Sequence, residues 1–174
     1  MKNSLVAVLI SLELVGCATS GSIPKVTLNT RTGYSQKVAD VIVGIKTDGI
    51  PATFTSPFVS NLRVLFAQHQ VNADVHAISE LDLDPLTQTQ IRKFSFSMFC
   101  IPTKTFSNQY ALQSITMNCT LTEIQKNIVV MKADVIAQKG WGFGFGQNEA
   151  EHATQELIKQ MEQAGLVSAQ QGTL

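Results

Sequence analysis

The sequence predicts a single α/β (α+β) domain, a mixed sheet of about five strands with helices packed mainly on one face. Two observations predict this class. Apolar segments with strand periodicity recur between residues 38 and 135. A helical pattern at residues 56–69 lies between two of them, and a second one at residues 148–165 follows the last. The 174 residues, with 13 basic and 13 acidic side chains, allow one core and give no net charge to attract nucleic acid. The predicted order is β-α-β-α-β-β-β-α.

The N-terminus carries the pattern of a bacterial lipoprotein. Lys2 gives a positive start, and residues 5–12 form an apolar run that is too short to span a bilayer. Residues 14–17, Leu-Val-Gly-Cys, are a lipobox, with a thiol directly after a small residue. We expect residues 1–16 to be a signal peptide and Cys17 to be lipidated. The alternative is an ordinary cysteine in a secretory signal, which the carboxylate of Glu13 in the apolar segment would favour.

Lipid chains on Cys17 would hold the protein on a membrane without a transmembrane helix, because each buried methylene contributes about 0.8 kcal/mol. Ala18 stands where an Asp would retain an enteric lipoprotein in the inner membrane. In a Gram-negative host this favours the outer membrane, with the protein facing the periplasm. Residues 17–35 are rich in Ser, Thr and Gly and predict a flexible tether. We expect a globular domain over residues 36–167 and a disordered tail over residues 168–174.

The first half of the domain contains two strand patterns and two helical ones. Residues 38–45 form a β-branched run that ends in turn residues, and residues 73–78 alternate weakly. A helix is expected between them, with Ser56 as its cap and Pro57 at its first position. A brief helix over residues 84–91 would be capped by Asp84. The apolar face of the longer helix comprises Phe58, Leu62, Leu65, Phe66 and His69.

Three consecutive strands and a helix complete the domain. Residues 94–100 alternate between polar and apolar side chains, and a hairpin turn is expected over residues 123–127. In the last helix Asn148 and Glu151 have capping-box spacing, and Gly165 ends the helical pattern so that Leu166 can fold back on Met161. The apolar faces of the second and third strands comprise Ile115, Met117, Cys119 and Leu121, then Val129, Met131, Ala133 and Val135.

This order of elements resembles the small lipoproteins and periplasmic domains related to the TolB N-terminal domain. They include penicillin-binding-protein activator lipoproteins, the curli-secretion lipoprotein and the Pel polysaccharide export lipoprotein. The resemblance covers about residues 37–167 and depends on the element order, on residues 115–136 and on the closing helix. Those families often carry an Asp and a Thr-Gly where this chain has Leu-Thr-Glu-Ile-Gln-Lys at residues 121–126. The resemblance implies a non-enzymatic module that binds envelope proteins or assembles into rings.

Two further thiols, Cys100 and Cys119, fall on the apolar faces of strands expected to be neighbours. A disulfide between them would close a loop of roughly twenty residues and contribute about 3 kcal/mol in the loop-entropy model. The periplasm is oxidising, which favours pairing. The alternative is two buried free thiols that act as small hydrophobic side chains.

The sequence contains no set of residues that predicts catalysis, a metal site or a cofactor. His69, His76 and His152 have no ligand spacing or partner motif and are interpreted as structural residues. Glu80, Asp82 and Asp84 alternate in a loop without the continuation of a calcium-binding loop, which indicates a solvated acidic segment. We therefore expect no enzyme activity.

Glycines and aromatic residues alternate strictly over residues 140–146. In an extended conformation Trp141, Phe143 and Phe145 would project from one face, and an exposed strip of this kind would be a partner or membrane contact. Alternatively, the strip continues the preceding strand into the core. A third reading is a phosphate-binding loop before a helix N-terminus, although the strip lacks the P-loop lysine.

Two classes of function follow from these features. The first is a membrane-anchored accessory lipoprotein that binds envelope proteins or its own copies to support a secretion, export, motility or cell-wall machine. The alternative is a lipid- or ligand-carrying lipoprotein or transporter auxiliary subunit, which requires an apolar cavity between helices and sheet.

Overall fold

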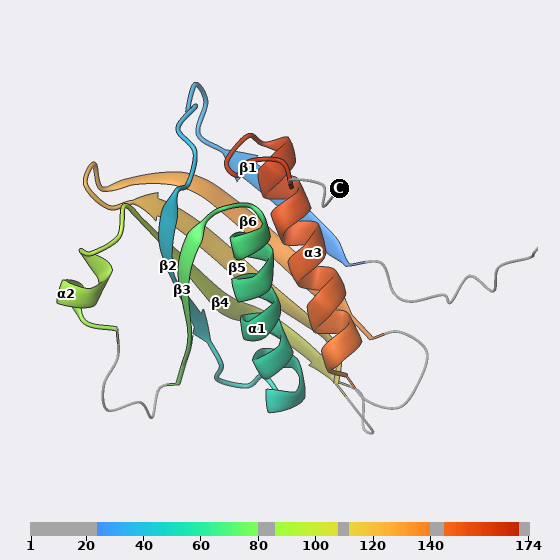
Figure 1. Ribbon diagram of the computed structural model, residues 1–174. Helices are drawn as coiled ribbons and strands as arrows, with labels where there is room; N and C mark the ends of the chain where they lie inside the picture. Colours follow the sequence, from blue (N-terminus) through green and yellow to red (C-terminus); the bar gives the residue numbers. More distant parts are fainter. Residues whose placement is uncertain (1–23, 80–85, 108–111, 140–144, 171–174) are drawn as a thin grey trace, which may run out of the picture.

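The computed structural model describes residues 24–79, 86–107, 112–139 and 145–170. They form two layers, in which two long helices lie on one face of a six-stranded sheet (Figure 1). The elements along the chain are β1 (Lys25–Thr30), β2 (Asp40–Lys46), α1 (Ala52–Gln68), β3 (Asn72–Ile78), α2 (Gln88–Ile91), β4 (Phe96–Ser107), β5 (Leu112–Glu123), β6 (Ile128–Gln138) and α3 (Gln147–Gln163).

The sheet is mixed, with the strand order β1-β6-β5-β4-β2-β3. β2 pairs in parallel with both β3 and β4, whereas the β4–β5, β5–β6 and β6–β1 pairs are antiparallel. The parallel β2–β3 pair is connected through α1, as parallel neighbours require a crossover. The predicted class of fold is confirmed, and the sheet has six strands instead of about five.

The additional strand is β1, which lies within the segment that we expected to be a tether. Val26 and Leu28 are partly buried against the core, opposite Val135 and Ala133 of β6. Only two apolar residues carry the alternation, so the sequence pattern was too short to distinguish an edge strand from a linker. The folded domain therefore already includes Lys25–Thr30 and does not begin only near Gln36.

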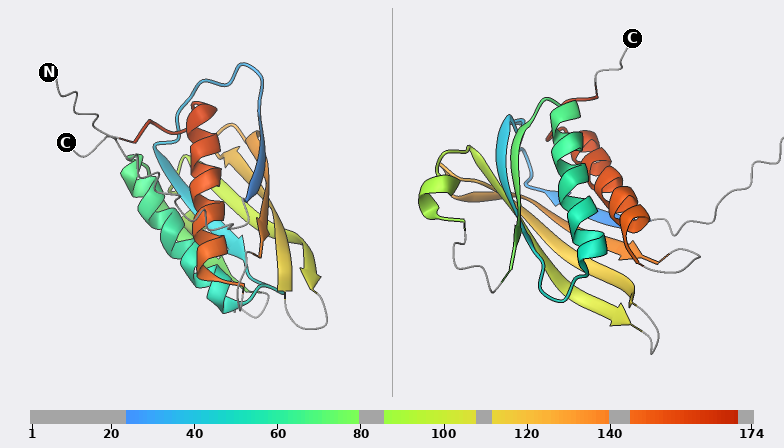
Figure 2. Two further views of the ribbon diagram at one scale, coloured as in Figure 1. Left: turned by 90° about the vertical axis from the view of Figure 1, so that its right-hand side faces the viewer. Right: turned by 60° about the horizontal axis from the view of Figure 1, so that its bottom comes forward.

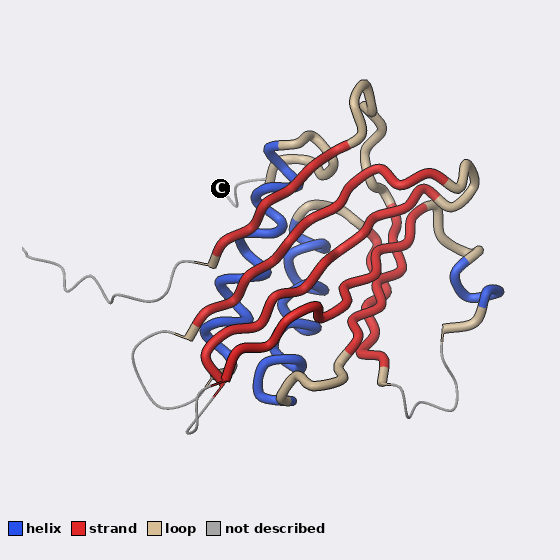
Figure 3. Tube along the Cα trace, turned by 180° about the vertical axis from the view of Figure 1, so that it is seen from behind, coloured by secondary structure: helices blue, strands red, loops and turns tan. Residues whose placement is uncertain are grey.

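The core lies between the sheet and the helix pair. Figure 2 shows α1 and α3 side by side on one face of the sheet, and their buried side chains meet the apolar residues of β2, β4, β5 and β6. Seen from behind, the other face of the sheet lies in front of both helices, and no helix of the described residues crosses it (Figure 3). The main helical contributors to the core are Phe54, Phe58, Leu62 and Phe66 of α1 and Leu157, Ile158 and Met161 of α3.

Helix α1 begins earlier than the cap at Ser56 that we expected. Its N-cap is Pro51, whose carbonyl accepts hydrogen bonds from the backbone of Phe54 and Thr55 at 3.0 Å each, and Pro57 lies inside the helix. Proline removes one helical hydrogen bond and costs about 3 kcal/mol in a helix interior. The extra turn buries Phe54 against Phe58, with ring centroids 5.4 Å apart, and this burial offsets that cost.

The N-caps of the other two helices also differ from the expected ones. α2 is capped by Thr87 with Gln90 in a capping box, and Asp84 lies outside the described residues. α3 begins two residues early, at Gln147, where the Gly146 N–H donates to the Glu149 carboxylate at 2.9 Å. Asn148 and Glu151 therefore do not form the cap.

The expected end of α3 is confirmed. Gly165 has φ +73°, a conformation that favours glycine, and the Leu166 N–H donates to the Met161 carbonyl at 2.9 Å. The tail expected from Ser168 onwards is fixed at its start, because His69 Nδ1 lies 2.5 Å from the Ser168 carbonyl oxygen.

One strand residue faces the opposite side from the expected one. An irregularity in the β5–β6 pairing follows Leu121, so that Leu121 pairs with Met131 and Thr122 with Val129. Val130 is the extra residue and is buried, while Val129 is 41% exposed. A bulge shifts the alternation by one residue, which sequence periodicity alone does not reveal.

Candidate docking surfaces

Strand β4 extends well beyond the expected end at Cys100 and carries a row of side chains on the open face of the sheet. We define the β4 row as Ile101, Lys104 and Phe106. These residues pair with Asn118, Thr116 and Ser114 of β5, whose neighbours Ile115 and Met117 face the core.

A pairing irregularity keeps the β4 row on one face. It lies between Pro102 and Lys104 and shifts the alternation, so that the open face changes from odd-numbered to even-numbered residues. Ile101 is 48% exposed and Phe106 is 64% exposed. The open face therefore presents an aromatic ring with a lysine two residues away, near the end of the strand.

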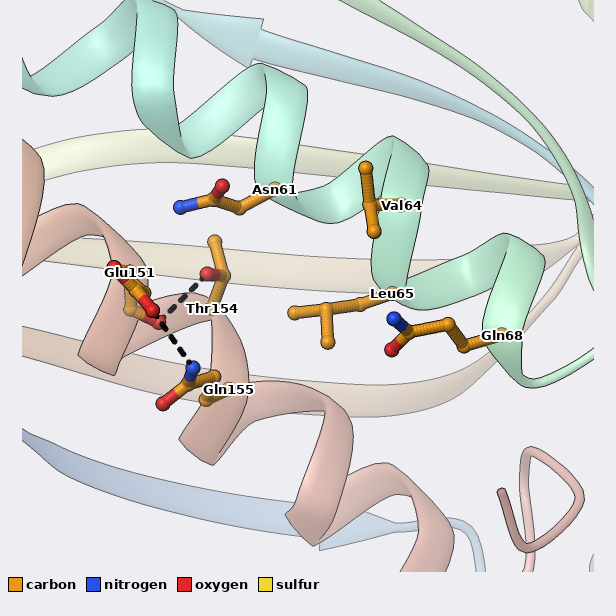
Figure 4. A pocket seen from close by; sticks show the side chains of 7 residues that line it. All are labelled: Asn61, Val64, Leu65, Gln68, Glu151, Thr154 and Gln155. Atoms are coloured by element: carbon orange, nitrogen blue, oxygen red, sulfur yellow. Dashed lines mark hydrogen bonds between the residues drawn. The ribbon is translucent and has the colours of Figure 1, made fainter. Parts of the chain in front are cut away.

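A groove of about 240 Å³ lies between the two long helices. Figure 4 shows its lining side chains, with Leu65 reaching toward α3 and Glu151 on the opposite wall. Val64 is 55% exposed beside it, and Glu151 accepts a hydrogen bond from the Gln155 side chain at 3.2 Å. The lining comprises Asn61, Val64, Leu65, Gln68, Glu151, Thr154 and Gln155.

The size and chemistry of this α1–α3 groove limit what it can bind. Sites for small molecules usually enclose roughly 300–1,000 Å³ and are mainly apolar. This groove is smaller, is lined by three amide side chains, and has apolar surface only at Val64 and Leu65. Its form suits a projecting side chain of a partner better than a carried lipid.

Helix α3 and the open face of the β1–β4 part of the sheet differ in charge. α3 carries four carboxylates, at Glu149, Glu151, Glu156 and Glu162, and one lysine, Lys159. The open face of β1, β4 and β6 carries Lys25, Lys104 and Lys132 against one carboxylate, Asp134, as the strand pairing defines it. α3 is therefore acidic, and the part of the open face formed by β1, β6, β5 and β4 is basic. β2 and β3 add Asp40, Asp74 and Lys46 to the open face, at the other side of the sheet.

Cys100 and Cys119 form a disulfide in the structure. They are direct partners in the β4–β5 pair, and both side chains are fully buried on the helix-covered side. Of the two alternatives left by the sequence, the described structure contains the paired thiols.

A buried carboxylate lies at the end of β5. Glu123 accepts a hydrogen bond from the Tyr34 hydroxyl at 3.1 Å and forms an ion pair with Lys126 at 2.7 Å. The hydrogen bond from Lys126 lowers the pKa of Glu123 most, and the Tyr34 bond adds to the effect. Burial, together with the nearby carboxylate, raises the pKa of Tyr34 to about 12. This cluster fastens the loop after β1 to the hairpin between β5 and β6.

The three histidines have different surroundings. His69 is buried and contacts the Ser168 carbonyl, His76 Nε2 lies 2.8 Å from Asp74 Oδ1 on the same strand, and His152 is exposed on α3. Within the described part of the chain, no three His, Cys, Asp or Glu residues gather as a metal-binding set. Glu80, Asp82 and Asp84 lie outside the described residues.

Only the end of the aromatic–glycine strip is described. Phe145 is 6% exposed and packs against Phe54, with ring centroids 5.3 Å apart, and its carbonyl accepts a hydrogen bond from Thr53 at 3.0 Å. At Phe145 the structure agrees with the core alternative and not with an exposed contact, because Phe54 in the first turn of α1 packs against the ring. Trp141 and Phe143 lie outside the described residues.

The lipobox with Cys17 also lies outside the described residues. In the part of the chain that is described, no helix is both long and apolar enough to cross a membrane.

Sequence reasoning did not identify Val64, Ile101 or Phe106 as surface candidates. Val64 lies outside the apolar stripe of α1, and its place beside α3 depends on tertiary packing. Pro102 interrupts the strand pattern just after Cys100, and proline is rare inside sheets. The Lys-Thr-Phe sequence at residues 104–106 has the alternation of a strand and was the signal that could have extended β4.

The fold defines the class of the molecule as a single α+β domain with one helix-covered sheet face. No protein-family model matches the chain, and no curated protein matches it in sequence. Among solved structures, the PelC dodecamer from Paraburkholderia phytofirmans is similar, with a TM-score of 0.50 and 13% identity over 82% of this chain and 98% of that chain. A variant PelC dodecamer from the same organism gives a TM-score of 0.49 and 12% identity, over 83% and 99% of the two chains. The first likeness shows that this chain shares the fold of PelC.

Proposed function

We propose that this chain is an accessory lipoprotein of the bacterial envelope that assembles with copies of itself. Cys17 anchors it to the outer membrane, facing the periplasm, and the assembly supports a secretion, export, motility or cell-wall machine. The observation that carries the proposal is the fold shared with PelC over 82% of the chain, because that protein forms a dodecamer. The lipobox of residues 14–17 supplies the anchor.

The surface of the domain supports assembly over catalysis. Large apolar side chains are exposed at Val64, Ile101 and Phe106, on two opposite faces. Exposed apolar and aromatic residues with complementary charge on another face are typical of protein interfaces. Trp141 and Phe143 remain candidate contacts with a partner or the membrane surface.

The test is cross-linking in intact Gram-negative cells, followed by separation of the membranes. The chain should fractionate with the outer membrane, and cross-linking should give a ladder of multiples of the chain alone. Recovery of the chain only as a monomer, or only in cross-links to other proteins, would contradict self-assembly. Recovery of the processed chain in the soluble fraction would contradict the lipid anchor.

A further inference from the structure

We infer that copies of this chain assemble head to tail, with Phe106 of one copy seated in the α1–α3 groove of the next and Lys104 paired with Glu151. This inference rests on the proposed self-assembly and names the surfaces that carry it. The juxtaposition that supports it is an exposed aromatic–lysine pair on one face and, on the other, a groove with an apolar wall and one carboxylate, Glu151.

The projecting partner is the end of β4. Lys104 and Phe106 are two residues apart, so both side chains leave the strand on the open face. Both residues are exposed, Phe106 to 64%. An exposed phenylalanine beside a lysine would bind a surface that offers apolar contact next to a carboxylate.

The receiving surface has these two properties. Leu65 and Val64 give the groove an apolar wall on α1, and Glu151 places a carboxylate on the α3 wall (Figure 4). The Gln155 hydrogen bond to Glu151 leaves the carboxylate able to accept further bonds, since a carboxylate has about four acceptor sites. Asn61 and Gln68 can satisfy polar groups at the rim.

Charge complementarity extends beyond this pair. α3 is acidic, with four carboxylates and one lysine, whereas the part of the open face formed by β1, β6, β5 and β4, which includes the β4 row, carries three lysines and one aspartate. Opposite potentials steer association and disfavour stacking of two identical faces. A second copy of the chain therefore offers an aromatic ring and a lysine to the groove, and an apolar wall and a carboxylate to the β4 row.

One copy cannot make this contact with itself. The β4 row lies on the open face of the sheet, and the groove lies on the helical layer on the opposite side (Figures 2 and 3). A contact between two different surfaces is heterologous, and repetition of it gives a closed ring when the rotation between copies closes. The two different surfaces therefore make the assembly head to tail, with every copy in the same orientation relative to the next.

The test uses the full chain, extracted from membranes in a mild detergent, with its mass measured by light scattering over a concentration series. Phe106→Ala, Lys104→Glu and Glu151→Lys should each weaken assembly roughly 10-fold or more, as loss of a central interface residue does. The double charge swap Lys104→Glu/Glu151→Lys should restore assembly. Lys93→Glu and Val129→Ala are matched controls, because both residues are exposed and lie on neither surface.

The outcomes separate this contact from self-assembly itself. If the unchanged chain assembles and the three single substitutions have no effect, the Phe106–groove contact is wrong and self-assembly stands. If the unchanged chain is a monomer at every concentration, self-assembly is also wrong. If Phe106→Ala instead abolishes binding of a different envelope protein, the occupant of the contact is not a second copy. Circular dichroism of each variant checks folding, because Glu151 lies in the first turns of α3.

Discussion

Cys100 of β4 and Cys119 of β5 lie directly opposite one another, with their Cα atoms 4.0 Å apart, and their sulfur atoms form a disulfide. Both residues are fully buried beneath the helices. The bond therefore joins the two central antiparallel strands inside the core, where a reductant reaches it only after local opening. A disulfide in this position fits a protein that folds in an oxidising compartment.

Removal of this disulfide should destabilise the domain. The two cysteines are 19 residues apart in sequence. The loop-entropy model gives about 3 kcal/mol for a loop of this size, so Cys100→Ala/Cys119→Ala should lower the free energy of unfolding by roughly that amount. Urea unfolding without reductant measures the difference. An unchanged midpoint and slope would show that the bond does not stabilise the fold.

Gly44 should not tolerate a larger residue. A Cβ at this position would lie 2.6 Å from the Ile78 side chain and 2.7 Å from the Phe99 ring. Gly44→Ala should therefore cost about 1–3 kcal/mol through overpacking. In the Phe99→Ala background the same substitution should cost less, because the ring is gone. Equal costs in both backgrounds, measured by urea unfolding, would argue against this contact.

The types of most elements follow from local sequence patterns. Alternation of apolar residues predicted β5 and β6, and the stripe of Phe58, Leu62 and Phe66 predicted α1. These patterns succeed because burial on one face imposes period two on strands and 3.6 on helices. The class of fold followed from the order of the elements.

The sequence predictions were wrong where tertiary contacts, and not local patterns, determine the secondary structure. Val26 and Leu28 form a strand only because they pair with the edge of β6. Helix α1 starts before Pro57 because this extra turn buries Phe54 in the core. Neither cause is visible in a local window. The groove was missed for the same reason, since its residues on α1 and α3 become neighbours only after folding. The β4 row was missed because the irregularity between Pro102 and Lys104 shifts the alternation within the strand.

The Glu123 carboxylate should make stability depend on pH. Its pKa is lowered from the ordinary 4.5, chiefly by the hydrogen bond from Lys126. A lowered pKa in the folded state stabilises the fold above the unfolded-state pKa, and this contribution is lost as the pH falls through the folded-state value. Glu123→Gln should be less stable than the unchanged chain near pH 7, and the two should converge at an acidic pH below the lowered pKa of Glu123. A difference that is the same at both pH values would contradict this role.

The anchor and the folded domain should be separable. Cys17→Ser should abolish membrane retention and leave a folded domain, because the described strands and helices, which start with β1 at Lys25, contain no residue of the lipobox. Membrane fractionation measures the first effect, and thermal unfolding of the released protein measures the second. Full membrane retention of the variant would mean that another part of the chain, with Trp141 as the first candidate, holds it there.

The central claim is self-assembly, and the mass of the purified full-length chain in mild detergent tests it most directly. Light scattering combined with native mass spectrometry should give one discrete species whose mass, after correction for detergent and lipid, is a whole-number multiple of the protomer mass. A monomer at every accessible concentration would contradict the account.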